Sequence, residues 1–355
     1  MKVKKNESDV YGSCFEYTTN GTVYTYKGMF HMSIVVRYCT GSCGYGGIGW
    51  TTFIDETNDL LLIVKSVLGG WFRYTRKSKP LKTTILLKFD VSLYRNIGFA
   101  ITPVKFFSKD TTVYAFSLLV KSNQAGGVAF LRYNPTNNRI SVIVNKRKHT
   151  LVIEEEDSLG SMFGAALGTA DLNRDGLEDL LIGAPAYSDD ETVECGALHI
   201  YFGGDIESIN KNRMRTIIGD KSGARFGSSI ATQDIDGDDI SEIIVGAPYE
   251  DDSGVVYVLS GLDVYETLTK IETYTMITIN KLKLTQRIVR KDAGRFGFSL
   301  LFVSDFDENG CNELAVGSPK TAAVELFNCV QSVNVTMTNK LIGEAVSPSF
   351  LWRYF

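Results

Sequence analysis

The sequence is poor in histidine and cysteine and has no long apolar run, and each shortage argues against a class of protein. Its 355 residues include three histidines, which stand apart from one another, and six cysteines, none of which forms a C-x-x-C pair. A zinc site is therefore not expected. No apolar run approaches the ~20 residues that cross a bilayer, so we expect no transmembrane segment. The basic start at residues 1–7 has no apolar stretch behind it, and the sequence as given shows no signal peptide.

Signatures of catalysis are also missing. The sequence contains no G-x-S-x-G and no H-E-x-x-H motif. The segment from Gly44 to Gly49 fits G-x-G-x-x-G, but a dinucleotide loop must lead into a helix. Here the β-prone run from Trp50 to Ile54 follows instead. We expect no enzyme, no catalytic residue and no nucleotide cofactor.

Acidic residues are concentrated in three short segments, although the net charge is only −4. The segments 171–179, 234–242 and 305–313 together hold thirteen acidic residues and one basic residue, Arg174. Such clustering suggests bound cations. The basic run 146–148 has no interleaved aromatic residues, so we interpret it as a solvated loop and expect no nucleic-acid partner.

Each acidic segment lies inside a longer repeat. A Phe-Gly pair stands upstream, at Phe163, Phe226 and Phe296, and an aliphatic run that ends in Gly-Ala-Pro or Gly-Ser-Pro stands downstream. Recurrence of one unit at a similar spacing predicts a repeat architecture. A further apolar strand follows in each unit, at 197–202, 255–259 and 323–327. Near-continuous apolar strands are typical of the inner strands of a β-propeller, whereas solenoid repeats are usually shorter.

The acidic segments fit the pattern D-x-[DN]-x-[DN]-G-x-x-[DE], whose positions 1, 3, 5 and 9 offer oxygen atoms. A purely oxygen ligand set favours Ca²⁺ over softer metals. We therefore predict about three structural Ca²⁺ sites. The predicted ligands are Asp171, Asn173, Asp175 and Asp179 in loop one, Asp234, Asp236, Asp238 and Glu242 in loop two, and Asp305, Asp307, Asn309 and Glu313 in loop three.

Two other interpretations of these loops fit less well. An EF-hand needs flanking helices and a Glu at position 12, but that position falls in an apolar run. The residues there are Ile182, Val245 and Val316. An ordinary acidic turn would not recur three times in register with the same flanking elements. Position 6 favours glycine, and because loop two has Asp239 there, we expect it to bind the cation more weakly.

These elements, in this order, resemble the FG-GAP repeats of integrin α subunits. The resemblance implies an all-β fold, a β-propeller of four-stranded FG-GAP blades, with about five of the family's seven blades in this chain. It is strong over about 163–335 and weaker upstream. The implied segments are an N-terminal segment or partial blade at 1–43, a diverged blade at 44–95, a degenerate blade without a cation loop at 96–135, blades with Ca²⁺ loops at 160–205, 223–262 and 293–335, and a C-terminal tail at 336–355. With fewer blades than the family and no leg domains, we expect a fragment, a truncated product or a diverged paralogue.

The resemblance also implies partners. In the family, a β subunit docks on the propeller and places a basic side chain among aromatic rings. The matching positions here are Phe163, Phe226, Phe296 and Phe298, for which plain core packing is the alternative. The chain would then be an adhesion-receptor propeller at the extracellular face of the plasma membrane, paired with an integrin β subunit and binding an extracellular-matrix or cell-surface ligand. The alternative is a soluble FG-GAP protein, either lectin-like or accessory to a phospholipase or hydrolase.

The cysteines and glycosylation motifs fit an extracellular chain. The family's third blade starts with a bridged cysteine, which suggests a disulfide between Cys14 and either Cys43 or Cys39. Cys311 and Cys329 lie in one repeat and could pair with each other. Three N-x-S/T motifs would mark a glycoprotein if the chain is secreted. They begin at Asn6, Asn20 and Asn334.

Overall fold

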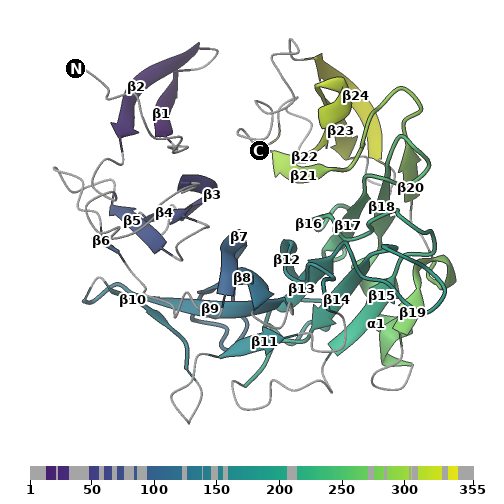
Figure 1. Cartoon of the computed structure of the whole chain (residues 1–355), viewed down its shortest axis with the longest axis horizontal. Coiled ribbons are helices and arrows are strands. Elements are labelled where there is room, and N and C mark those ends of the chain that lie inside the picture. Colours follow the sequence, from purple (N-terminus) through teal and green to yellow (C-terminus); the bar gives the residue numbers. More distant parts are fainter. Residues whose placement is uncertain are drawn as a thin grey trace.

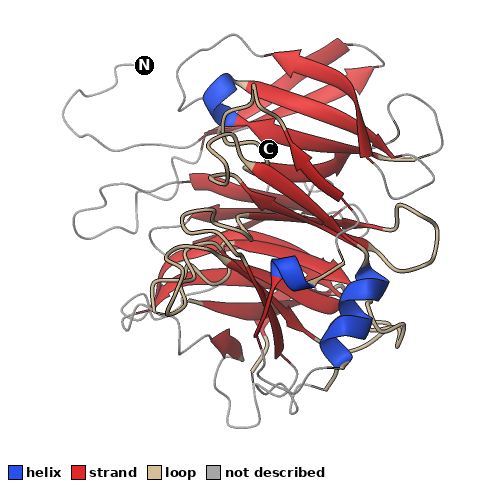
Figure 2. Ribbon diagram, turned by 90° about the vertical axis from the view of Figure 1, so that its right-hand side faces the viewer, coloured by secondary structure: helices blue, strands red, loops and turns tan. Residues whose placement is uncertain are grey.

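The computed structural model is built almost wholly of β-strands, arranged as small sheets around a common centre (Figure 1). It describes residues 13–20, 23–31, 48–55, 60–65, 70–75, 84–85, 94–121, 126–137, 139–144, 151–154, 159–205, 214–270, 276–283, 286–303, 305, 311–329 and 335–342. Within them the helical share is small, as Figure 2 shows. The helices there are α1 (Gly261–Thr269), η4 (Ile279–Lys281) and η5 (Pro319–Thr321).

A hairpin and two sheets make up the first part of the chain. The hairpin joins β1 (Ser13–Asn20) to β2 (Val23–His31). The next sheet has the order β3-β4-β5-β6. Its strands are β3 (Ile48–Asp55), β4 (Leu60–Lys65), β5 (Gly70–Thr75) and β6 (Thr84–Ile85). The following sheet has the order β10-β9-β8-β7, and β11 also pairs with β9. Its strands are β7 (Tyr94–Val104), β8 (Val113–Lys121), β9 (Gly127–Asn134), β10 (Arg139–Val142) and β11 (Val152–Glu154).

Three sheets contain the repeats found in the sequence. The first runs β12-β13-β14-β15-β19, the second β16-β17-β18-β20 and the third β21-β22-β23-β24. The first comprises β12 (Ala166–Ala170), β13 (Asp179–Ala184), β14 (Ala197–Tyr201), β15 (Met214–Ile218) and the parallel strand β19 (Met276–Thr278). The second comprises β16 (Ser229–Gln233), β17 (Glu242–Ala247), β18 (Val255–Leu259) and β20 (Gln286–Val289). The third comprises β21 (Ser299–Val303), β22 (Glu313–Ser318), β23 (Ala323–Cys329) and β24 (Val335–Ile342).

The strand that begins each sheet lies nearest the centre. β12 contacts β7 on one side and β16 on the other, and β16 in turn contacts β21, as Figure 1 also shows. Antiparallel sheets that stand radially around a centre are the blades of a β-propeller. The predicted all-β propeller is confirmed.

The hydrophobic core lies between adjacent sheets. One cluster joins Leu181 of β13 to Val245 of β17, and another joins Val256 of β18 to Val316 of β22. The second strand of each repeat is buried along its whole length. Its near-continuous apolar sequence follows from this, because both faces of such a strand meet a neighbouring blade.

Glycines explain why Phe-Gly and Gly-Ala-Pro occur together. A Cβ atom on Gly183, in the Gly-Ala-Pro of one sheet, would lie 2.1 Å from the carbonyl oxygen of Gly227, in the Phe-Gly of the next. The same relation holds between Gly246 and Gly297, at 2.0 Å. The backbones of adjacent blades therefore approach too closely to leave room for a side chain at Gly183 or Gly246.

The predicted blade boundaries end before the outer strands of the sheets begin. In the first two repeat sheets the fourth strands, β15 and β20, begin after the expected blade ends at 205 and 262. The segment expected to be a C-terminal tail from 336 contributes most of β24, which pairs with β23. β20 has one buried residue among its four, so it lacks the continuous apolar pattern that marks the inner strands.

Candidate cation loops

Loop one, between β12 and β13, is ordered by its own carboxylates. Asp171 accepts hydrogen bonds from the backbone N–H groups of Asp175 at 3.2 Å and Gly176 at 2.8 Å. Asp175 in turn accepts one from the N–H of Leu177 at 2.7 Å. Asn173 accepts from the N–H of Asp175 at 3.0 Å, so the side chains at positions 1, 3 and 5 all accept hydrogen bonds from the backbone of their own loop.

The carboxylate at position 9 is the buried member of the predicted ligand set. Asp179, the first residue of β13, is fully buried and accepts hydrogen bonds from the N–H groups of Leu172 and Gly203, both at 2.9 Å. Burial raises the pKa of this carboxyl to about 7, and the charges of Asp175 and Asp171 add to the rise. A buried carboxylate beside two others is unfavourable unless a cation compensates it.

Loop two, between β16 and β17, repeats this arrangement. Asp234 accepts from the N–H groups of Gly237 at 2.7 Å and Asp239 at 3.0 Å. Glu242, at position 9, is 1% exposed and accepts from the N–H of Ile235 at 2.7 Å. Burial raises the pKa of Glu242 to about 7, and the other three predicted ligands of the loop add to the rise.

The oxygen atoms of loop two lie close enough for one ion. Ligand atoms of Asp234, Asp236 and Glu242 all fall within 4.8 Å of one another. Oxygens on opposite sides of a Ca²⁺ ion would be about 5 Å apart, since each Ca–O distance is about 2.3–2.6 Å. The donor set contains oxygen only, so its size and chemistry fit Ca²⁺. Such an ion would supply the positive charge that the buried carboxylate lacks.

The backbone of the loops uses the left-handed region at two positions. At position 6, Gly176 has a φ of 82° and Asp239 a φ of 65°, as the pattern predicts for this turn. Position 4 is left-handed as well, at Arg174 (55°) and Gly237 (78°). Loop one therefore has its glycine at position 6, and loop two has its glycine at position 4.

Loop three is described only at its ends. Asp305 corresponds to Asp234 of loop two, and Glu313 corresponds to Glu242. Glu313 is the first residue of β22 and is 2% exposed. The predicted ligands Asp307 and Asn309 lie outside the described residues, as does Gly310. Position 12 of each loop is fully buried within a strand, which excludes an EF-hand ligand there. The three residues are Ile182, Val245 and Val316.

Neighbouring loops touch one another, which the sequence does not predict. The guanidinium of Arg174, in loop one, donates to the backbone carbonyl of Asp238, in loop two. On the other side of loop one, Lys109 of the preceding sheet lies against Gly176: a Cβ there would be 2.7 Å from the Lys109 Nζ. Basic side chains from one blade therefore approach the acidic loop of the next.

The predicted partner-binding aromatics are mostly internal. Phe163, Phe226 and Phe296 are fully buried. Their rings contact His199, Tyr257 and Phe327 of their own sheets, with centroids 5.1, 5.5 and 5.8 Å apart. Core packing, the alternative interpretation, accounts for these three rings. Phe298 is only partly buried and keeps some exposed surface.

The structure describes only some of the cysteines that were predicted to form disulfides. Cys39 and Cys43 lie outside the described residues, and nothing is described of the Cys14 side chain. Cys311 is disulfide-bonded, whereas Cys195 is a buried free thiol. The pairing of Cys311 with Cys329 stays a prediction. Cys329 ends β23, and the neighbouring strand β22 starts just after Cys311.

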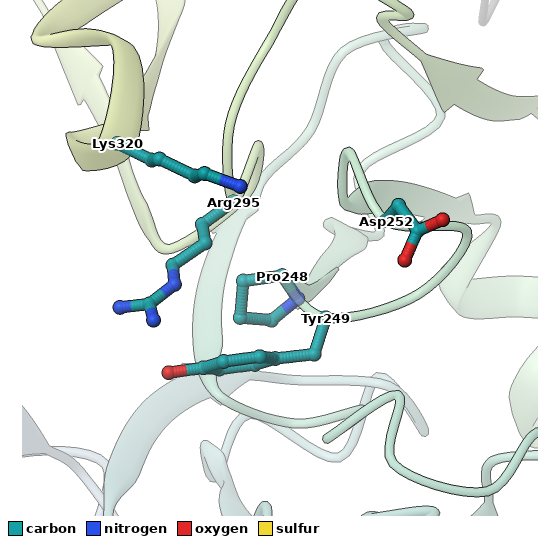
Figure 3. A pocket seen from close by; sticks show the side chains of 5 residues that line it. All are labelled: Pro248, Tyr249, Asp252, Arg295 and Lys320. Carbon is teal, nitrogen blue, oxygen red and sulfur yellow. The ribbon is translucent and has the colours of Figure 1, made fainter.

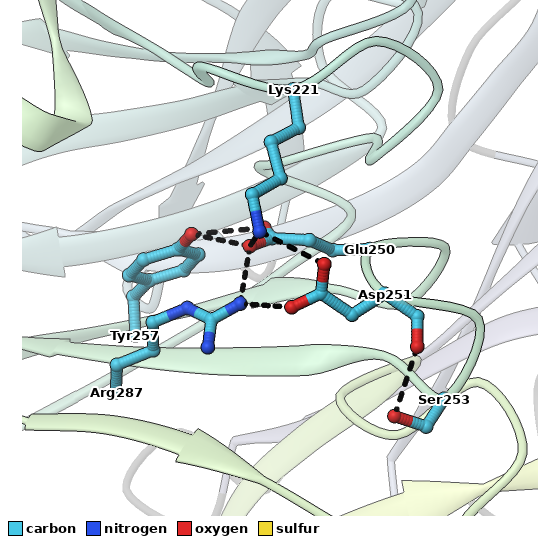
Figure 4. Close-up of polar contacts among 6 residues, drawn as sticks. All are labelled: Lys221, Glu250, Asp251, Ser253, Tyr257 and Arg287. Carbon is cyan, nitrogen blue, oxygen red and sulfur yellow. Dashed lines mark hydrogen bonds and ion pairs between the residues drawn. The ribbon is translucent and has the colours of Figure 1, made fainter.

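A charge network that the sequence does not predict centres on Glu250, which follows the end of β17 opposite to its acidic loop (Figure 4). The Glu250 side chain is 2% exposed and forms ion pairs with Arg287 at 2.7 Å and Lys221 at 3.2 Å. The Tyr257 hydroxyl donates to both its oxygens, at 2.8 and 2.9 Å. Burial raises the pKa of Tyr257, so the phenol stays protonated as a donor. The network ties β18 and β20 to the connection that precedes β16.

Among the residues that the structure describes, there is no helix with the length and apolar character needed to span a membrane.

Comparison with known proteins agrees with the repeat. The FG-GAP repeat family matches residues 163–201 and 226–259. Integrin alpha-PS5 of Drosophila melanogaster is 28% identical over 254 residues, covering 71% of this chain and 24% of that protein. Integrin alpha-4 of Xenopus laevis is 33% identical over 189 residues, covering 51% and 17%, and human integrin alpha-6 is 30% identical over 253 residues, covering 70% and 20%.

The chain spans about a quarter or less of the length of these relatives. A protein of unknown function from Desulfotomaculum acetoxidans DSM 771 superposes with a TM-score of 0.49 at 10% identity, over 92% of this chain and 76% of its own. At that score the superposition adds nothing to the assignment. The repeats and the sequence matches together identify the chain as an integrin α-like propeller region with FG-GAP repeats.

Proposed function

We propose that this chain is the propeller of an adhesion receptor, that it binds Ca²⁺ structurally in its acidic loops, and that it pairs with an integrin β subunit. The observation that carries the proposal is the pair of cation loops with buried position-9 carboxylates, set in a propeller related to integrin α subunits. The chain would act at the extracellular face of the plasma membrane and bind a matrix or cell-surface ligand, without catalysis.

Calcium would act by neutralising carboxylates that repel one another. Asp171, Asp175 and Asp179 would hold it in loop one together with Asn173, and the four predicted ligands would do so in loop two. At a free concentration ten times Kd, each site would stabilise the folded chain by about 1.4 kcal/mol. Thermal unfolding in Ca²⁺ and in EGTA measures this: a higher Tm in Ca²⁺ supports the proposal, and equal values contradict it.

A matched pair of variants separates metal binding from charge alone. Glu242→Gln removes the buried ligand of loop two, whereas Glu266→Gln removes an exposed carboxylate of α1. We expect isothermal titration with Ca²⁺ to lose one site in the first variant and none in the second. Retention of every site in Glu242→Gln would exclude that carboxylate as a ligand.

Pairing with a β subunit needs a separate experiment. We expect a tagged form of the chain to co-purify with an integrin β subunit when both are expressed in one cell. Phe298→Ala should weaken this association, because that ring keeps exposed surface, whereas Phe226 is fully buried and its substitution would reduce folding instead. A chain that is efficiently secreted yet never pairs would argue against the receptor proposal while leaving the calcium sites untouched.

A further inference from the structure

Two positions of the repeat lie at the face opposite the cation loops. The first immediately precedes Phe-Gly, and the second immediately follows Gly-Ala-Pro or Gly-Ser-Pro. The cation loops join the first and second strands of each sheet, so residues before the first strand and after the second lie at the other ends of the strands. We call the two positions the entry position and the exit position.

The backbone makes the two positions equivalent in all three repeats. The N–H of each exit residue donates to the carbonyl of the residue just before the entry position, at 2.9 Å for Ala186 to Ser161, 3.3 Å for Tyr249 to Ala224 and 3.2 Å for Lys320 to Gly294. Every entry residue has a left-handed φ. The values are 59° for Met162, 55° for Arg225 and 63° for Arg295.

The side chains at these positions nevertheless differ between the repeats. The first repeat has Met162 and Ala186, which shows that the turn forms without any charge. The second has Arg225 and Tyr249, and the third has Arg295 and Lys320. Because one fold accommodates both apolar and basic pairs, the basic residues of the later repeats are not required by the turn.

The basic side chains gather around one tyrosine ring. The guanidinium carbons of Arg225 and Arg295 lie 4.8 and 4.9 Å from the centroid of the Tyr249 ring. Arg225 is already paired with Glu194, at 2.7 Å. Arg295 and Lys320 have no acidic partner among the described residues. Two cations at the ring disfavour a third from a partner, so the ring is poorly suited to receive a basic side chain.

A small pocket opens between these side chains (Figure 3). It has a volume of about 210 Å³ and is lined by Pro248, Tyr249, Asp252, Arg295 and Lys320. Figure 3 shows Arg295 and Lys320 close together on one side of it, with Asp252 across from them. The lining side chains carry two positive charges and one negative charge, which leaves the pocket with a positive balance.

We propose that this pocket binds the carboxylate of an aspartate or glutamate side chain presented by a partner protein. Arg295 can offer two parallel N–H donors to a carboxylate, and Lys320 adds a second charge beside it. The pocket is smaller than the roughly 300–1,000 Å³ of sites for drug-sized molecules, but it accommodates the end of one side chain. The site is independent of the cation loops, which lie at the opposite ends of the strands.

The test uses the full chain and short peptides as probes. Saturation-transfer NMR would measure the binding of a capped Gly-Ser-Asp-Ser-Gly peptide, of its twin with Asn for Asp, and of inorganic phosphate by competition. The diagnostic variant is Arg295→Met with Lys320→Ala, which installs the residues that the first repeat already has. The control is Lys270→Ala with Lys281→Ala, which removes the same charge from two exposed positions elsewhere.

We expect the Asp peptide to bind, the Asn peptide not to bind, and the diagnostic variant to lose about tenfold or more in affinity. The control should retain affinity to within about twofold. Equal loss in both variants would mean general electrostatic attraction and would overturn the proposal. A higher affinity for phosphate than for the Asp peptide would also overturn the proposal, in favour of a free-anion site.

The folded state of the variants is checked independently. Far-UV circular dichroism and the Ca²⁺-dependent Tm should match those of the unmodified chain, because neither position contributes to the core. If the double variant fails to fold, Lys320→Ala alone, at an exposed position, should still lose about threefold in affinity for the Asp peptide. Undiminished binding by that single variant would then overturn the proposal.

Discussion

A Cβ atom on Gly246 would lie 2.0 Å from the carbonyl oxygen of Gly297, which stands just before the first strand of the next blade. Gly246 is not in the left-handed region, so any residue could adopt its backbone, and only contact excludes one. We expect Gly246→Ala to lower the free energy of unfolding by about 2 kcal/mol or more, because two blades would have to separate. Urea denaturation in saturating Ca²⁺ measures the loss.

Gly223→Ala is the matched control for this substitution. Gly223 has a φ of 75° and no atom near the position of an added Cβ, so its substitution costs only backbone strain. We expect a loss of about 1 kcal/mol. If both variants lost the same amount, close approach of the blades would not be the reason for the glycine in Gly-Ala-Pro.

Inner strands and the turns of the acidic loops could be predicted from sequence because their constraints are local and repeated. β13, β17 and β22 are buried on both faces, which enforces apolar residues along their length. The left-handed turn at position 6 selects Gly176 and tolerates Asp239. The pattern of such positions survives in each copy and can be aligned without any structure.

Contacts between blades could not be predicted in this way. Arg174 reaches Asp238, and Tyr249 meets Arg225 and Arg295, only because the propeller brings the ends of distant segments together. No spacing in the sequence encodes such a distance. The outer strand β24 was not predicted for another reason: its sequence mixes polar with apolar residues and lacks a continuous apolar run.

Glu250→Gln tests the buried charge network. The carboxylate is 2% exposed and accepts from Arg287, Lys221 and the Tyr257 hydroxyl. Its neutralisation would weaken each of these bonds, although Asp251 would still compensate the two partly exposed cations. We expect the free energy of unfolding to fall by about 2 kcal/mol. Glu266→Gln, at the exposed pair with Lys270, should cost less than about 0.5 kcal/mol. A comparable loss in both variants would show that the Glu250 network contributes no more than a surface pair.

Asp239→Gly and Asp239→Asn separate charge from backbone strain in loop two. Both substitutions remove a carboxylate, but only glycine adopts the φ of 65° without cost. In EGTA we expect Asp239→Gly to be more stable than Asp239→Asn by about 0.5–1 kcal/mol, measured by urea denaturation. Equal stability would mean that the left-handed turn at position 6 carries little strain. Isothermal titration of both variants with Ca²⁺ would then report the effect of the lost charge alone.

His199 makes stability depend on pH. The ring is buried among Phe163 and Tyr187, and burial lowers its pKa from 6.5 to about 3. Its contribution is fully present above pH 6.5 and is lost as pH falls, because the unfolded chain then binds a proton that the folded chain excludes. Between about pH 6 and pH 3 the loss is about 1.4 kcal/mol per pH unit.

His199→Gln should remove this component while leaving every carboxylate in place. The difference in free energy of unfolding between the original chain and the variant should therefore change steadily over that pH range. Thr216→Val is the control: it removes the 3.0 Å partner of the His199 Nδ1 but no titrating group, so its offset should stay constant with pH. Parallel pH profiles for the original chain and His199→Gln would mean that the folded protein accommodates the charged imidazole, which a ring whose pKa is lowered by burial should not permit.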